Sequence, residues 1–117
     1  MLPRDTGYLL DMFEAARVVL TVTQGRAPDD LDSDVMLQST VYWQVCVLGE
    51  AANQLSADFR EEHPDTPWHE VVGIRNRLIH GYREIKNEIV WNVIQMRLPP
   101  LIAFLSQFVT LEDPDTT

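Results

Sequence analysis

Apolar side chains recur at helical spacing along most of this chain, and no segment alternates over the length of a β-strand. A first helix is predicted from about residue 6 to residue 23, and a polar break over residues 25–30 ends it. The second predicted helix is the longest. Its apolar stripe continues over residues 37–59, and Asp32 or Ser33 stands before it as a candidate cap.

Two more helices are predicted in the second half of the chain. The third is capped by Thr66, has Pro67 at its first position and ends at Gly81. The fourth runs over residues 87–108. Within it, Pro99-Pro100 is expected to kink or break the helix, because proline lacks a backbone donor and clashes with the preceding turn.

These segments predict one all-α domain over residues 1–110, an up-and-down bundle of four to five helices, and residues 111–117 are expected to form a disordered tail. A hydrophobic content of 45% in 117 residues is ample for one core. No apolar run is long enough for a membrane span, and the start lacks the pattern of a signal peptide. No membrane partner is therefore expected.

The second helix carries more apolar surface than one buried face requires. Tyr42, Trp43, Cys46 and Val47 extend its apolar character around the helix, which favours a symmetric dimer built on this surface. Gly49 lies in the same helix, where glycine costs about 1 kcal/mol relative to alanine. Either another group approaches closely at this position or the helix simply tolerates the glycine.

Charge is distributed unevenly along the chain. The net charge of −9 argues against broad nucleic-acid binding, but residues 75–97 carry five basic and two acidic side chains. Such a patch suits a compact phosphate-binding site, although a solvated helix face of mixed charge would give the same count. Cys46 is the only cysteine, so no disulfide can form within the chain, and a reducing cytoplasmic location is expected.

The most informative segment is the octet Arg75 to Tyr82, which reads Arg-Asn-Arg-Leu-Ile-His-Gly-Tyr. Arg75 offers a planar cation, His80 a proton acceptor or donor near neutral pH, and Tyr82 a hydroxyl group. If the substrate is RNA, His80 can take the proton of the ribose 2′-hydroxyl, and Arg75 can stabilise charge on phosphorus. Asn76 can orient His80 or bind a phosphate oxygen.

Arg77, Arg83 and Lys86 are candidates for binding RNA phosphates beside this pair, and Glu50 is a possible residue of the same cleft. No metal site is expected, because the histidines are spaced by 6 and 11 residues without a fitting carboxylate pair, and no cofactor is expected.

Five residues of helix rotate by about 140°, so Arg75 and His80 cannot share one helix face. Three arrangements would bring them together: the helix ends near His80 and turns at Gly81, the Arg75 side chain reaches around, or two copies of the motif meet across a dimer axis.

Each residue also has a purely structural interpretation. Arg75 suits an ion pair with Glu50 or Glu70, and His80 suits a helix C-terminus, where the helix dipole favours a cation. Tyr82 suits packing against the last helical turn, while Asn76 and Glu50 suit exposed positions that face water.

Together with other positions, these residues resemble the HepT-like toxins of the HEPN superfamily over nearly the whole chain. The resemblance is carried by Gly49-Glu50-Ala51, Pro67-Trp68, Arg75-Asn76, His80-Gly81-Tyr82, Ile89-Val90-Trp91 and Leu98-Pro99. The pattern of arginine, four residues, histidine, one residue and tyrosine is specific in this context. One departure is Lys86-Asn87, where an acidic residue is more usual, and it concerns the contacts of the local loop.

The resemblance implies a dimeric helical bundle that brings two copies of the motif into one cleft. It implies a metal-independent ribonuclease toxin and a partner, an MntA-type nucleotidyltransferase antitoxin, which transfers AMP from ATP to the motif tyrosine. By position, Arg75 and His80 match the catalytic pair, Asn76 the supporting residue and Tyr82 the AMPylated tyrosine. Two rivals are a non-catalytic module that binds a nucleotide or a partner, and a structural dimer with a degenerate site. The intact pair argues against the second rival.

Overall fold

The computed structural model describes residues 2–81, 83–84 and 86–109, and over these residues the chain forms helices without strands. The helices are α1 (Pro3–Thr23), α2 (Asp30–Ser33), α3 (Val35–Gln54), α4 (Ala57–Glu62), α5 (Trp68–Gly81) and α6 (Asn87–Leu105). The all-α prediction is therefore confirmed. The predicted tail lies outside the described residues.

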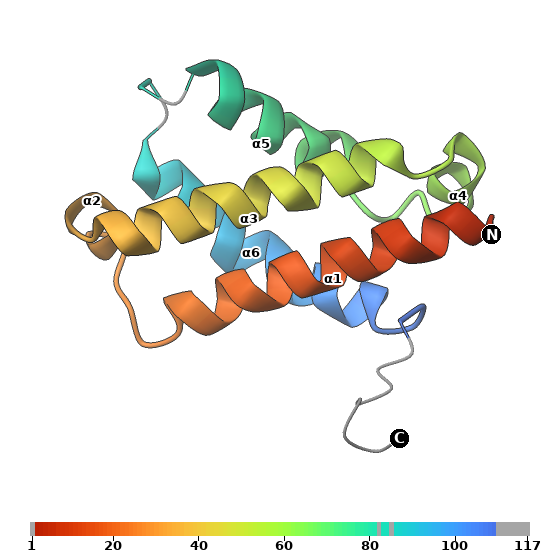
Figure 1. Ribbon diagram of the computed structural model, residues 1–117, viewed down its shortest axis with the longest axis horizontal. Helices are drawn as coiled ribbons and strands as arrows, with labels where there is room; N and C mark the ends of the chain where they lie inside the picture. Colours follow the sequence, from red (N-terminus) through yellow and green to blue (C-terminus); the bar gives the residue numbers. More distant parts are fainter. Residues whose placement is uncertain (1, 82, 85, 110–117) are drawn as a thin grey trace.

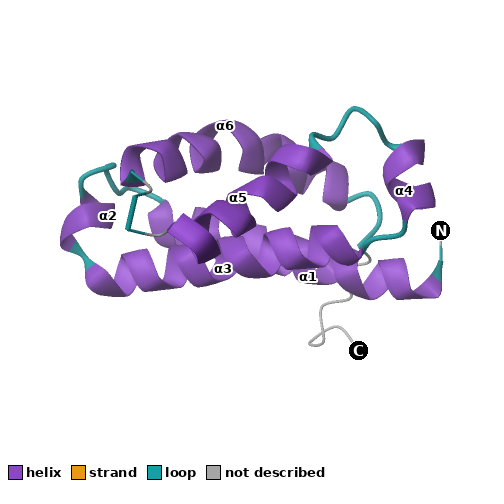
Figure 2. Cartoon of the chain, turned by 90° about the horizontal axis from the view of Figure 1, so that it is seen from above, coloured by secondary structure: helices purple, strands orange, loops and turns teal. Residues whose placement is uncertain are grey.

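The four long helices form the predicted up-and-down bundle. Figure 1 shows that α1, α3, α5 and α6 each run opposite to the long helix before them, with α5 on top of the bundle. Helix α1 packs against α3 and α6, and α3 also packs against α5. The view from above in Figure 2 shows α5 crossing the layer that α3 and α1 form. One side of α5 therefore faces the bundle and the other faces solvent.

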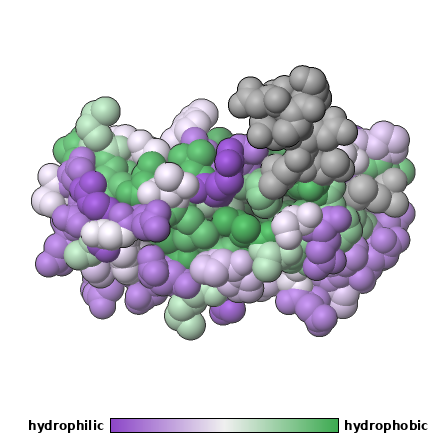
Figure 3. Space-filling view, turned by 90° about the horizontal axis from the view of Figure 1, so that it is seen from below, coloured by the Kyte–Doolittle hydropathy of each residue, from purple (hydrophilic) through white to green (hydrophobic). Residues whose placement is uncertain are grey.

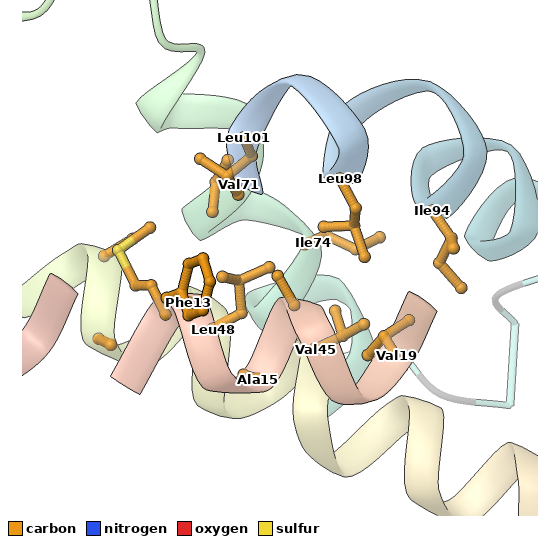
Figure 4. Close-up of a cluster of buried hydrophobic side chains, with 14 of the residues drawn as sticks. Phe13, Ala15, Val19, Val45, Leu48, Val71, Ile74, Ile94, Leu98 and Leu101 are labelled. Atoms are coloured by element: carbon orange, nitrogen blue, oxygen red, sulfur yellow. The ribbon is translucent and has the colours of Figure 1, made fainter. Parts of the chain in front are cut away.

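The core is built from one apolar face of each long helix. In Figure 4 the side chains of α5 and α6 point toward those of α1 and α3, with Val71, Ile74, Ile94, Leu98 and Leu101 across from Phe13, Val19, Val45 and Leu48. All of these side chains are buried. Burial of such side chains contributes about 1.5–3 kcal/mol each relative to exposure. This burial stabilises helices that would be only marginally stable in isolation.

The predicted second helix is shorter than its apolar stripe. Helix α3 ends at Gln54, whereas the stripe continues to Phe59 in α4. Ser56 separates the two helices, because its hydroxyl accepts a hydrogen bond from the Phe59 amide (3.1 Å) as an N-cap. Leu55 and Phe59 are both buried, so the stripe describes the core correctly although the helix does not continue through it.

The predicted cap of the second helix is also wrong. Asp34 caps α3 by accepting a hydrogen bond from the Leu37 amide (3.1 Å), while Asp32 and Ser33 belong to the short helix α2. Leu31 is fully buried, and this anchors α2 against α3 and α6.

The other predicted boundaries are close to the observed ones. Helix α5 ends at Gly81 as predicted, but it begins at Trp68, so Pro67 precedes the helix and its carbonyl accepts the Val71 amide (3.1 Å). Helix α6 does not break at Pro99 and Pro100. The carbonyls one turn before the prolines belong to exposed residues, so water can bind the acceptors that proline leaves unpaired.

Polar contacts between distant segments fix the ends of the bundle. At one end, buried Asp5 of α1 accepts hydrogen bonds from the amide (2.9 Å) and the hydroxyl (2.7 Å) of Ser56. At the other end, the Tyr42 hydroxyl donates to the Asn87 side-chain oxygen, and the Asn87 amide nitrogen donates to Asp32 (2.7 Å). Tyr42 is thus engaged inside its own chain and is not part of the apolar surplus of α3.

No helix in the described part of the chain is both long enough and apolar enough to cross a membrane. Figure 3 shows the underside of the molecule, opposite α5, where apolar surface lies in the middle of the face and polar side chains lie around it.

Candidate functional site

The hollow between α1 and α6, of about 550 Å³, is not where the candidate chemistry lies. Its two arginines, Arg17 and Arg26, form ion pairs with carboxylates of neighbouring residues. Arg75, Asn76, Arg77 and His80 lie instead on α5, and Glu50 lies on the part of α3 beneath it.

Arg75 lies on α5 with its guanidinium between two polar partners. One terminal nitrogen is 3.3 Å from a carboxylate oxygen of Glu50 on α3, and the other donates to the side-chain oxygen of Asn76 (2.9 Å). The side chain of Arg75 is 29% exposed and that of Glu50 is 48% exposed, so solvent weakens their attraction. The ion pair orients the cation and leaves part of it accessible to an anion.

Gly49 determines how closely Arg75 approaches α3. A Cβ atom at Gly49 would lie 2.3 Å from Cβ and 3.2 Å from Cγ of Arg75, and 3.2 Å from the carbonyl oxygen of Val71. Of the two interpretations open for this glycine, close approach is therefore correct. The absence of a side chain lets the stem of Arg75 lie directly on the backbone of α3.

A hollow of about 350 Å³ opens beside Arg75 between α1, α3 and α5. It is lined by Tyr8, Asp11, Trp43, Cys46, Val47, Glu50, Ala51, Arg75 and Ile79. Trp43 is 68% exposed and Ile79 is 44% exposed, so the apolar surplus of α3 is present at Trp43 and continues onto α5.

Cys46 also lines this hollow, but it is a weak nucleophile there. Burial raises the pKa of its thiol, and the nearby positive charge of Arg75 offsets only part of this effect. The thiol therefore stays protonated at neutral pH, and the charged side chains of the hollow are Asp11, Glu50 and Arg75.

His80 lies in a different hollow at the end of α5. This hollow, of about 480 Å³, is lined by Asn76, Arg77, His80, Gly81 and Glu84. Asn76 and His80 are four residues apart on one helix, so their side chains lie on the same face. Asn76 thus contacts the guanidinium of Arg75 while lining the hollow of His80.

Arg75 and His80 of one chain therefore do not line the same hollow. The helix ends at Gly81 as one of the three arrangements supposed, yet both residues lie within α5, and the two side chains open into different hollows. Asn76 lies between them. Most of the structural interpretations also hold, since Arg75 pairs with Glu50 and His80 stands in the last turn of α5. Asn76 and Glu50 are exposed. Glu70 pairs instead with Arg97 (2.9 Å).

Fewer basic side chains are available to bind phosphate than the sequence suggests, because Arg97 forms an ion pair with Glu70. Arg77, Arg83 and Lys86 are exposed, and none of the ion pairs found over residues 2–81, 83–84 and 86–109 involves them. Tyr82 lies outside the described residues. Among the residues that are described, no three His, Cys, Asp or Glu side chains are grouped so that they could hold a metal ion.

Sequence reasoning missed the contribution of α1 to this region. Tyr8 and Asp11 line the hollow of Arg75, but their spacing along α1 carries no signal of this role. Their position depends on the packing of α1 against α3, which brings together residues far apart in the chain.

Comparison with known proteins identifies related chains. A family described as "Ribonuclease HepT-like" matches residues 12–108. A protein of Methanocaldococcus jannaschii, MJ1380, named as a candidate RNase, is 32% identical over 86% of this chain and 94% of its own length. A protein of Thermococcus cleftensis, named as a probable ribonuclease HepT, is 30% identical over 80% of this chain and 86% of its own length. No solved structure matches.

Proposed function

The chain belongs to the HepT-like ribonuclease family, and from this premise we propose that it is the toxin of a toxin–antitoxin pair and cleaves RNA without a metal ion. The ribonuclease activity follows from the family. The catalytic residues, the dimer and the antitoxin are the parts that we propose.

The observation that carries the proposal is the arrangement on α5. Arg75, Asn76 and His80 follow one another around the helix, and the candidate cation and the candidate base open into separate hollows. Both groups have to reach one phosphodiester. Two copies related by a two-fold axis would satisfy this condition if Arg75 of one copy faced His80 of the other.

The surface next to Arg75 supports such a dimer. Trp43 and Ile79 are large apolar side chains that are substantially exposed on adjoining helices, and they line the same hollow as Arg75. Burying them against a second copy would remove apolar surface from water and bring the two α5 helices together. The dimer we propose therefore uses α3 and α5, with Trp43 and Ile79 near its centre.

In the proposed reaction, the imidazole of His80 accepts the proton of a ribose 2′-hydroxyl. The 2′-oxygen attacks the adjacent phosphorus, the bond from phosphorus to the 5′-oxygen breaks, and the 5′-oxygen leaves with a proton from solvent. Arg75 stabilises the negative charge that develops on the phosphoryl oxygens. Asn76 and Glu50 orient the guanidinium, and Arg77, Arg83 and Lys86 bind flanking phosphates. The products carry 2′,3′-cyclic phosphate and 5′-hydroxyl ends.

The partner we propose is an MntA-type nucleotidyltransferase antitoxin that transfers AMP to Tyr82. Tyr82 stands in the sequence between Gly81 and Arg83, next to exposed cations that would bind substrate phosphate. AMP would add negative charge and bulk at that position and thereby compete with RNA. We place the pair in the cytoplasm, where the single Cys46 stays reduced.

The test of the proposed function is cleavage of single-stranded RNA by the purified protein, with mapping of the new ends. His80→Ala and Arg75→Ala should each lower the rate by about 10²–10⁴-fold while keeping the helical circular dichroism spectrum. The matched control is Arg17→Ala, which removes an exposed arginine on α1 and should cleave at the wild-type rate. Loss of wild-type cleavage in EDTA, or full activity of His80→Ala, would contradict the proposal.

A further inference from the structure

Another hollow with polar lining, here called the second hollow of α5, lies at the opposite end of this helix from the motif. It has about 480 Å³, and its lining comes from the end of α3, from α4 and from the start of α5: Asn53, Ala57, Arg60, Glu61, Trp68, His69 and Val72. In Figure 2, α4 lies beside the start of α5, while the other end of α5 points away from α4. This hollow and the hollow of His80 therefore lie at the two ends of one helix.

The two hollows lie on the same face of α5. His69, Gly73, Asn76 and His80 follow one another at spacings of four, three and four residues, which places them on one stripe of the helix. A Cβ atom at Gly73 would meet nothing within 4 Å. Gly73 therefore adds no side chain to this stripe, and the open space above it leaves room for an extended ligand between the two hollows.

The groups in the second hollow suit one segment of single-stranded nucleic acid. Arg60 is partly exposed, and none of the ion pairs in the described part of the chain involves it. Its planar fork of donors matches a phosphate. The exposed His69 ring offers a surface on which a base can stack, and the exposed Asn53 amide can bond to a base edge. Glu61 is the acidic group of the hollow, and its charge offsets part of the attraction between Arg60 and a phosphate.

We infer that the RNA strand cleaved beside His80 continues across Gly73 into this hollow, where Arg60 binds a phosphate and His69 stacks on a base. The inference rests on the proposed function, because it extends the substrate path of that same site. Eleven residues of helix separate His69 from His80, a distance of about 16 Å. A stacked strand covers this distance in about five nucleotides at 3.4 Å each, so the substrate is a single strand longer than the cleaved step.

The test measures binding separately from cleavage. The probe is an RNA of roughly ten nucleotides, within the site sizes of single-strand-binding folds, with 2′-O-methyl groups that remove the attacking hydroxyl. Arg60→Gln and His69→Ala should each weaken binding of this probe by about tenfold in fluorescence anisotropy. Arg60→Gln should also reduce the slope of log K against log salt by about 0.7, the value of one phosphate contact on a single strand.

Two controls make the result specific. A 2′-O-methyl dinucleotide is too short to span both hollows, so Arg60→Gln should leave its binding unchanged. Arg17→Gln removes the same charge from α1 and should leave binding of the longer probe unchanged. If Arg60→Gln and His69→Ala bind the longer probe as tightly as the wild type, with the same salt dependence, the inference is overturned. A wild type that binds the probe but cleaves no RNA would contradict the proposed function alone.

Discussion

At the scale of single residues, Gly49 lets the stem of Arg75 lie directly against α3. Glycine is unfavourable in the middle of a helix, yet here any side chain would occupy the space of the Arg75 stem. Because Arg75 is part of α5, a group inserted at Gly49 would push the guanidinium and the helix outward together. Gly49 is therefore a positioning residue for Arg75.

Gly49→Ala should lower RNA cleavage on the order of 10²-fold, since a displacement of about 1 Å at a catalytic group has that effect. It should also destabilise the fold by about 1–3 kcal/mol through overpacking, although alanine favours the helix. Rates should be measured at a temperature where circular dichroism shows the variant to be folded.

Gly7→Ala is the matched control, because a Cβ atom at Gly7 in α1 would meet nothing within 4 Å. This variant should gain up to about 1 kcal/mol of stability and keep its activity. If Gly49→Ala cleaves RNA as fast as Gly7→Ala does, the contact does not position Arg75.

The residue types of the octet and the resemblance to the HepT-like family singled out Arg75, Asn76 and His80 as candidates, and helical periodicity predicted that Asn76 and His80 share a face of the helix. Glu50 was identified as a candidate residue of the cleft, and its ion pair with Arg75 was one of two alternatives. The contributions of Tyr8 and Asp11 could not be predicted, since they depend on contacts across the bundle. The separation of Arg75 and His80 into two hollows also required the structure.

At the scale of helices, the apolar pattern predicted the four long helices but not the corner between α3 and α4. The apolar stripe continues across residues 55 and 56, because apolar side chains are buried in the core both before and after the corner. What breaks the helix there is polar: the Ser56 hydroxyl caps α4, and Asp5 of α1 binds both the amide and the hydroxyl of Ser56. A contact between residues 51 positions apart leaves no periodic signal.

The contact of Asp5 with Ser56 at this corner makes the free energy of unfolding depend on pH. Burial raises the pKa of Asp5, but the hydrogen bonds from Ser56 and the charge of Arg4 outweigh it, so the pKa lies below its usual value of 3.8. A carboxylate whose pKa is lower in the folded state stabilises the fold above its unfolded-state pKa of about 3.9, and this contribution is lost as the pH falls through the folded-state pKa.

Asp5→Asn should therefore reduce the free energy of unfolding by about 1–3 kcal/mol at pH 7, and by less as the pH falls below the unfolded-state pKa of about 3.9. Urea unfolding of the variant and the wild type across this range measures the difference. Asp65→Asn, in an exposed loop, is the control and should match the wild type throughout. A destabilisation by Asp5→Asn that does not change with pH would mean that the charge of Asp5 is not what the corner requires.

At the scale of the whole molecule, an acidic body carries a small cluster of exposed cations at one end of α5. Arg77, Arg83 and Lys86 form this cluster, and Tyr82 lies within it in the sequence. Negative charge added at Tyr82 would be placed where substrate phosphate has to bind. If the proposed antitoxin transfers AMP to Tyr82, it adds this negative charge beside Arg83 in the sequence, where it would compete with RNA.

Tyr82→Phe should keep at least part of the ribonuclease activity but resist neutralisation by the nucleotidyltransferase, because the hydroxyl that accepts AMP is missing. Mass spectrometry of the wild type after incubation with that enzyme and ATP should show AMP on the peptide that contains Tyr82. A fully neutralised wild-type protein with unmodified Tyr82 would show that the antitoxin acts by masking the site.

The central claim is that two copies of the chain form two shared catalytic centres, each with Arg75 from one copy and His80 from the other. The most direct measurement is the activity of a mixed dimer of Arg75→Ala and His80→Ala, co-expressed with two different tags and purified on both. One of its two centres then has an intact arginine and an intact histidine, so the mixed dimer should recover about half of the wild-type activity. Doubly tagged dimers of either variant alone should stay inactive. A mixed dimer that forms but cleaves no RNA would contradict the claim, and so would a wild-type protein that is fully active as a monomer.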